Sequence, residues 1–244
     1  MSNQLMYLER YSFIYKDLDS DFYDLLVTKG DTYVPAVAEY EKISVLGRNG
    51  NLIRDKGTYQ DREITLNTLL LINPYESYDK DFIEWLTNTD TDKENKLFYE
   101  YYDRYYLVKK VDVTETKYSD VGIEYVIKFL CEPFLYGKDK KFILNATETE
   151  KTLLYDGNAP ADTNIRIYGS GNIQLEIDDM LVTIENVDEF VDLDSKLMMC
   201  TDKLGTNKSI DMIGDFPTLT KARNKVSFIG DVEKIEIKYK DTYL

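Results

Sequence analysis

The chain has 244 residues and a formal net charge of −15, from 30 Lys and Arg against 45 Asp and Glu. It contains no His, which excludes Ser-His-Asp and Cys-His catalytic groups and every imidazole metal ligand. Two Cys are too few for a tetrahedral thiolate zinc site. The basic stretches, Lys109-Lys110 and Lys138 to Lys141, are short or interrupted, so we expect no specific binding to the phosphates of nucleic acids.

The first ten residues lack a basic segment followed by an apolar one, and the longest apolar run, Leu69 to Ile72, is too short to span a bilayer. We therefore expect a soluble chain with no secretion signal and no contact with a membrane. Cys131 and Cys200 do not suggest a disulfide-stapled fold, so a reducing compartment is the simpler assumption.

Turn and strand signals begin in the first quarter of the chain. Gly47-Arg48-Asn49-Gly50 predicts a β-hairpin, because its Asn-Gly pair supplies positive φ angles. Arg62 to Leu70 predicts a strand by its alternation. Asp81 to Leu86 places Phe82, Trp85 and Leu86 on one helical face, with Asp81 and Glu84 spaced like a capping box, and predicts a short helix near residues 80–88.

The stretch from Leu97 to Tyr106 has helical spacing but consists of residues that favour strands. We predict a strand, a turn at Tyr102-Asp103 and a second strand, and the preference for strands over a helix rests partly on the family resemblance described below. From residue 121 to 131 every second residue is apolar, which predicts one buried strand face, while Glu124 and Lys128 point to the other face.

The second half of the chain shows further short strands bounded by turn residues, which favours antiparallel sheets. Gly169-Ser170-Gly171-Asn172 is a second hairpin signal. The remaining strand predictions are Thr163 to Tyr168, Ile173 to Ile177, Leu181 to Ile184, Lys225 to Ile229 and Glu233 to Tyr239.

A domain boundary is predicted after Cys131-Glu132-Pro133-Phe134-Leu135-Tyr136-Gly137, where a long strand meets a Pro and a charged patch follows. The expected domains are residues 1–136, β-rich with the single helix, and residues 137–244, which show only short strands.

Several residue groups resemble sites of known chemistry. Asp178, Asp179 and Glu185 could supply a glycosidase acid pair, although solvated surface acids are the favoured interpretation and Asp178-Asp179 has the character of a turn. Asp17 to Asp21 and Asp90 to Glu94 imitate calcium loops but lack the Gly and the final Glu that such loops need. We assign no catalytic, cofactor-binding or metal-binding residue.

Cys131 lies on the apolar face of its strand and Cys200 follows two Met, so both are expected to be buried and unreactive. The tyrosines from Tyr99 to Tyr106 could form a sugar- or base-stacking platform, but core packing or a subunit interface is favoured.

A further set of motifs follows one order along the chain: Val45 to Gly50, Gly57 to Tyr59, Ile64 to Leu66, Trp85-Leu86, Leu97, Tyr105-Tyr106, Cys131 to Phe134, Ile165 to Gly171, Val191 to Ser195, Gly214 to Leu219 and Asn224 to Ser227. Together these motifs resemble the distal tail protein (Dit) family of siphophages that infect Gram-positive bacteria. Two positions depart from the family pattern, because Leu46 stands where the family commonly has Pro and Ala222 stands where it usually has Gly.

This resemblance implies a structural virion protein at the distal end of a phage tail, made in the cytoplasm of the bacterial host, with no enzymatic activity and no cofactor. It implies a homohexameric ring that joins the tail tube protein to the tail-associated fibre or lysin and to receptor-binding proteins. DNA would pass through the ring. Residues 1–136 would form the ring, and residues 137–244 a galectin-like antiparallel β-sandwich outside it.

Two other functions remain open at this stage. A carbohydrate-binding adhesion module would use exposed aromatic residues of the C-terminal sandwich, and a cell-wall glycan hydrolase would need a catalytic carboxylate. The segment from Gly47 to Gly57 is our candidate for an extension that wraps the neighbouring subunit.

Overall fold

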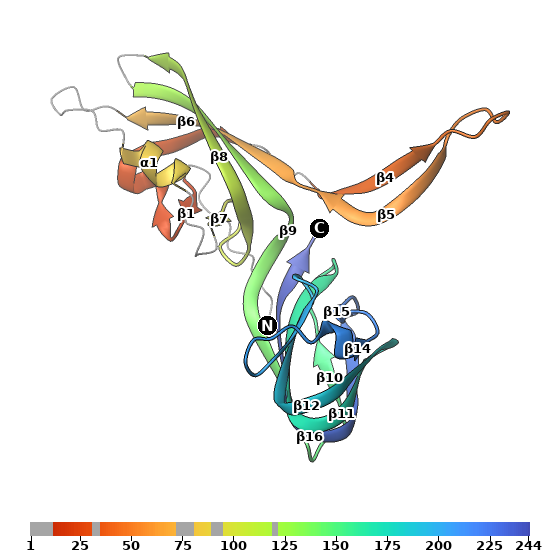
Figure 1. The fold of residues 1–244 in the computed structure, drawn as a ribbon. Coiled ribbons are helices and arrows are strands. Elements are labelled where there is room, and N and C mark those ends of the chain that lie inside the picture. The colour runs from red at the N-terminus through yellow and green to blue at the C-terminus, as the bar shows by residue number, and fades with distance from the viewer. Residues whose placement is uncertain (1–11, 31–34, 72–80, 89–94, 119–121) are drawn as a thin grey trace. The chain divides into compact units, whose positions relative to one another are not determined.

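The structure is a computed structural model that describes residues 12–30, 35–71, 81–88, 95–118 and 122–244. It is mainly β, with one short α-helix among the described residues, and this confirms the predicted β-rich fold class (Figure 1). The chain divides into two compact units, which we call the N-terminal unit (Met1–Tyr136, with Leu244) and the C-terminal unit (Gly137–Tyr243).

In the N-terminal unit, seven strands follow the order β3, β6, β9, β8, β7, β1, β2 within one sheet. A separate two-stranded sheet consists of β4 and β5. The strand bounds are β1 (Ile14–Tyr15), β2 (Leu18–Asp19), β3 (Leu25–Gly30), β4 (Val37–Ile43), β5 (Leu52–Gln60), β6 (Arg62–Leu71), β7 (Lys96–Phe98), β8 (Tyr105–Tyr118) and β9 (Gly122–Asn145), and a 3-10 turn, η1, spans Ser20–Tyr23.

The start of β9 provides the centre of this unit's core. Every second side chain from Ile123 to Cys131 is buried, whereas Lys128 is exposed, as the alternation predicts. Val121, which the same pattern includes, lies outside the described residues. The predicted strand at Arg62 is β6, which pairs with β9 from Arg62 opposite Cys131 to Leu71 opposite Gly122.

The predicted helix is confirmed as α1 (Asp81–Thr87), with Phe82 and Leu86 buried. The ring of Phe82 packs edge-on against Tyr125 of β9, with the centroids 5.1 Å apart. Asp81 and Glu84 both lie in the first turn, where negative charge suits the helix dipole. The strand, turn, strand prediction for residues 97–106 is also confirmed, because β7 pairs with β8 across a loop that contains Tyr102 and Asp103.

The prediction that a strand ends at Pro133 is wrong, because β9 continues through it for twelve further residues to Asn145. Residues 132–134 bulge opposite the single residue Leu107, between the pairs Cys131 with Val108 and Leu135 with Tyr106. A bulge leaves backbone groups out of the ladder, so it accommodates a residue without an N–H. The buried Arg62 donates a hydrogen bond to the Pro133 carbonyl.

In the C-terminal unit, the sheet order is β13, β12, β11, β16, β9, with β10 on β16, β14 on β12 and β15 on β11. The bounds are β10 (Glu150–Leu154), β11 (Ala161–Ile177), β12 (Met180–Asp194), β13 (Met199–Asp202), β14 (Met212–Ile213), β15 (Thr218–Leu219) and β16 (Arg223–Tyr243), and a second 3-10 turn, η2, spans Ser209–Asp211. The two strands predicted on either side of residues 169–172 form one long strand, β11. The two predicted on either side of residues 230–232 form another, β16.

The hairpin predicted at Gly169-Ser170-Gly171-Asn172 is therefore wrong. The segment is an irregularity within β11, where the register shifts against both β12 and β16. Gly171 has φ +73°, and a Cβ on Gly169 would lie 2.2 Å from the Asp231 carbonyl oxygen. Glycine thus allows close strand approach and a bend, and not a chain reversal.

Both halves of each long strand contribute to a single core. From β11 this core contains Ile165 and Ile167 before the irregularity and Ile173, Leu175 and Ile177 after it. Leu219, at the end of the Gly214 to Leu219 motif, is also buried there, and β15 pairs with the start of β11. The C-terminal unit consequently has one hydrophobic core despite its few, long strands.

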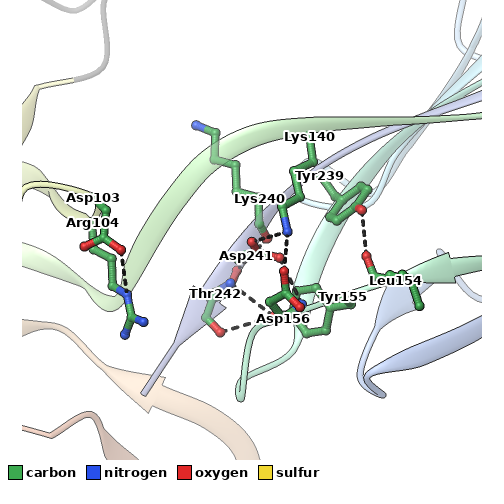
Figure 2. Close-up of polar contacts among 10 residues, drawn as sticks. All are labelled: Asp103, Arg104, Lys140, Leu154, Tyr155, Asp156, Tyr239, Lys240, Asp241 and Thr242. Atoms are coloured by element: carbon green, nitrogen blue, oxygen red, sulfur yellow. Dashed lines mark hydrogen bonds and ion pairs between the residues drawn. The ribbon is translucent and has the colours of Figure 1, made fainter. Parts of the chain in front are cut away.

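The last residues of β16 are held by a polar cluster (Figure 2). Lys140 Nζ lies 2.6 Å from Asp241 Oδ2 and 2.7 Å from Asp156 Oδ2. The buried Tyr155 hydroxyl donates to the Thr242 carbonyl at 3.2 Å and accepts from the Thr242 N–H at 3.1 Å. These contacts fix residues 155–156 and the end of β16 to each other within the C-terminal unit.

Candidate functional site

The calcium-like run near the N-terminus is a structural turn. Asp17 connects β1 to β2 with φ +62°, and Asp19 caps η1 by accepting a hydrogen bond from the Asp21 N–H at 3.0 Å. The second run, Asp90 to Glu94, lies outside the described residues. Among the residues that the structure describes, no group of three or more His, Cys, Asp or Glu side chains could hold a metal ion.

The three carboxylates considered for glycoside hydrolysis do not face one another across a cleft. Asp178 and Asp179 form the turn between β11 and β12, as predicted, and Lys221 lies 3.8 Å and 3.2 Å from their respective carboxylates. Glu185 is exposed on β12. These positions suit turn formation and surface charge.

Neither cysteine is a candidate nucleophile. Cys131 and Cys200 are both buried and unpaired with each other. Burial raises the pKa of Cys131 to about 12 and that of Cys200 to about 11. Both thiols therefore stay protonated at neutral pH and contribute to packing, as the sequence predicts.

The tyrosine cluster belongs mainly to the core of the N-terminal unit. Tyr105 and Tyr106 are buried, and the Tyr105 ring packs 5.5 Å from Phe98 and 6.1 Å from Tyr136. Of the three residues Tyr102, Tyr105 and Tyr106, only Tyr102 is well exposed. The cluster does not present a row of free ring faces for stacking.

A hollow of about 310 Å³ lies beside α1. Tyr23 and Trp85 pack there with their ring centroids 5.2 Å apart. Lys16 Nζ donates to the Trp85 carbonyl at 3.0 Å and also to the Asn88 carbonyl, so its charge caps the carbonyl end of the helix. We assign this hollow a role in anchoring α1, and no ligand.

The aromatic residues of the C-terminal unit offer little to a carbohydrate. Tyr168 and Phe190 lie side by side on its surface, with ring centroids 5.9 Å apart. Lys234 Nζ lies 4.4 Å from the Tyr168 ring centroid, and the Arg166 guanidinium carbon 4.4 Å from that of Phe190. Each ring thus has a face occupied by a cation, which competes with stacking of a sugar.

The β4–β5 hairpin is the most distinctive surface feature of the N-terminal unit. Its loop contains the predicted Gly47 to Gly50 turn, in which Gly47 and Gly50 have positive φ angles but Asn49 does not, contrary to expectation. The strands β4 and β5 flank this loop and pair antiparallel, so the predicted hairpin is confirmed, although no bounds for its strands were predicted. Large apolar side chains are exposed along the hairpin at Val37, Tyr40, Ile43, Val45, Leu46, Leu52 and Ile53.

The hairpin is pinned by local contacts. Glu39 Oε2 accepts a hydrogen bond from Thr58 Oγ1 at 3.1 Å and pairs with Lys56 Nζ at 3.4 Å. Gly57 has φ +72°, and its N–H donates to Asp55 Oδ1 at 2.8 Å, beside a register shift between the two strands. An ordered hairpin with exposed apolar side chains is suited to contact with another protein surface.

No helix of the described residues is long and apolar enough to cross a membrane. No known family model matches the sequence, and no curated protein matches it either. A crystal structure that does match is that of the Dit protein of phage SPP1, described as a paradigm of the hub adsorption apparatus in phages that infect Gram-positive bacteria. The match covers 96% of this chain and 99% of that chain, with a TM-score of 0.69 and 14% sequence identity. The chain therefore has the fold of that hub protein.

Proposed function

We propose that this chain is a distal tail protein of a phage, a structural hub at the tip of the tail. The observation that carries the proposal is the fold match to a phage hub protein over nearly the whole length of both chains. The collinear Dit-like motifs add support, because they are a property of the sequence and not of the fold. A fold alone does not define a function, so the proposal also rests on the surfaces.

The proposed assembly is a homohexameric ring formed by residues 1–136. A head-to-tail contact that closes into a ring buries the same two surfaces on every subunit. The β4–β5 hairpin supplies one suitable surface, since its apolar side chains are exposed in the single chain. We propose that this hairpin, which contains the candidate segment Gly47 to Gly57, wraps the neighbouring subunit.

Residues 137–244 are proposed to be a galectin-like sandwich outside the ring. The partners of the hub would be the tail tube protein, the tail-associated fibre or lysin, and receptor-binding proteins, all at the distal end of the virion tail. A structural role and not an enzymatic one is proposed because the matched fold is that of a phage hub protein.

The solution mass tests this proposal. Light scattering with negative-stain imaging of the same peak should find a six-fold ring near 6 × 28.5 = 171 kDa. Mass should fall to that of the monomer on dilution without loss of folded structure. A chain that stays monomeric at high concentration, alone and when mixed with its tail tube protein, would contradict the ring.

A further inference from the structure

One solvent-facing surface of the C-terminal unit is formed by neighbouring strands whose register is known. Ile229 of β16 lies opposite Gln174 of β11, Gln174 opposite Thr183 of β12, and Thr183 opposite Ile213 of β14. Side chains directly opposite in a sheet share one face. These four residues therefore form a row across four strands.

The adjacent row follows from the same register. Glu176 of β11 lies opposite both Ser227 of β16 and Leu181 of β12. The two rows together make up what we call the Ile213 face. The alternate residues of the same strands, such as Leu175, Val182 and Val226, belong to the core.

The Ile213 face exposes apolar side chains that the described residues of the C-terminal unit leave uncovered. Leu181 is 53% exposed, Ile213 63% and Ile229 70%. Exposed apolar side chains that gather on one sheet face are typical of a surface that contacts another protein.

Acidic residues accompany this apolar centre. Glu176 is part of the face, and Glu185 lies two residues beyond Thr183 on β12. Lys225, two residues before Ser227 on the same strand face, is paired with Glu150 at 2.6 Å. The net charge around the apolar residues is therefore negative.

We propose that the Ile213 face docks a different protein of the tail tip, one whose contact surface has apolar side chains bordered by Lys and Arg. A second copy of this chain is the poorer occupant, since it would bring the same acidic border to the contact, and like charges are unfavourable there. The proposal rests on the hub function and adds a surface and a partner chemistry to it.

Genomic replacement by Ile213→Lys tests the contact, with the proteins of purified particles quantified by mass spectrometry. Lysine removes apolar area and repels a basic border, so one other protein should fall by more than about tenfold. Leu204→Lys is the matched control, because Leu204 is 82% exposed and follows β13, which pairs with β12 at Val191 to Asp194 and not at Leu181 or Thr183. Full composition in Ile213→Lys particles would overturn the proposal.

The acidic border has its own test. Glu185→Lys keeps every apolar side chain but reverses one charge, so the same protein should leave the particles at a lower salt concentration than in the wild type. Unchanged salt resistance would refute a basic partner surface.

Two controls separate the possible causes. If the isolated Ile213→Lys chain has a lower mass in solution than the wild type, the face binds a second copy and the proposal is wrong. If the wild-type chain itself is missing from released particles, the hub function fails, and the docking proposal fails with it. The Ile213→Lys chain must also have the unfolding temperature of the wild type, so that loss of the other protein reflects the changed surface and not a misfolded hub.

Discussion

At the scale of single residues, glycines decide where two strands can approach each other. Gly169 sits where β11 passes β16, and the Asp231 carbonyl oxygen occupies the space of a Cβ. A Cβ on Gly137, in contrast, would lie 3.4 Å from its nearest neighbour, the Asp241 Cβ, which is an ordinary van der Waals contact. The two positions therefore differ in their tolerance of a methyl group.

Gly169→Ala should reduce the free energy of unfolding by about 2 kcal/mol or more, because the added Cβ forces the two strands apart. Gly137→Ala is the matched control and should change it by less than about 1 kcal/mol. Urea unfolding of both variants measures the difference. Equal stability of the two would show that β11 and β16 can separate at Gly169 without cost.

At the scale of elements, ion pairs join β9 to β16 inside the C-terminal unit. The Glu236 carboxylate forms ion pairs with Lys141 Nζ of β9 and with Lys234 Nζ of its own strand, each at an N–O distance of 2.8 Å. The hydrogen bonds from Lys141 and then Lys234 lower the pKa of Glu236 from 4.5 to about 2. Since the carboxylate is only slightly exposed, these contacts are less screened than ordinary surface pairs.

Glu236→Gln should therefore destabilise the protein by about 1 kcal/mol at neutral pH. A pKa that is lower in the folded state stabilises the fold above the unfolded value of 4.5, and the benefit disappears as pH falls towards 2. The gap between wild type and variant, measured by urea unfolding, should narrow across that range. Glu185→Gln is the control, because Glu185 has no ion pair in the described chain, and the stability difference from wild type should not narrow in the same way. If the stability difference for Glu236→Gln does not depend on pH, the loss of the charge is not the cause of the destabilisation.

The hairpin can be tested without removing it. The double change Leu46→Lys and Ile53→Lys places charge where two exposed apolar side chains stand, and should reduce the ring to monomers. Asn49→Lys with Asn51→Lys adds the same charge to polar positions of the same loop and should leave the ring intact. Light scattering decides between them, and a ring that survives the first pair of changes would rule out the hairpin as the subunit contact. Deletion of residues 47–57 should abolish the ring as well.

At the scale of the whole molecule, charge opposes assembly. A ring of six chains would carry 6 × −15 = −90 formal charges. Like charges held close together repel, and salt weakens the repulsion beyond a Debye length of about 10 Å at 0.1 M.

Ring formation should consequently strengthen as salt rises from about 20 mM to about 300 mM, over which the Debye length falls severalfold. Sedimentation at fixed protein concentration would show a growing fraction of the 171 kDa species (6 × 28.5). Dissociation of the ring by salt would instead indicate that ion pairs between subunits dominate the interface.

The local features of this protein follow from its amino-acid pattern alone. Period-2 alternation identified the buried face of β9, helical spacing identified α1, and glycines located the β4–β5 loop. The turn at Asp178-Asp179 also followed from local pattern, because it depends on immediate neighbours in the chain. Alternation placed Cys131 on an apolar strand face, whereas its inertness depends on burial within the fold.

Where strands continue and which faces stay open depend on pairing between segments that are distant in the chain. Pro133 and Gly169 to Asn172 signal a break in any local pattern, yet β9 and β11 run on because neighbouring strands keep pairing on both sides of a bulge. Alternation likewise indicates which side chains share a face but not what covers that face. The exposed apolar residues of the hairpin and of the Ile213 face therefore became visible only when the fold showed which strands lie beside them, and which sides nothing in the described chain covers.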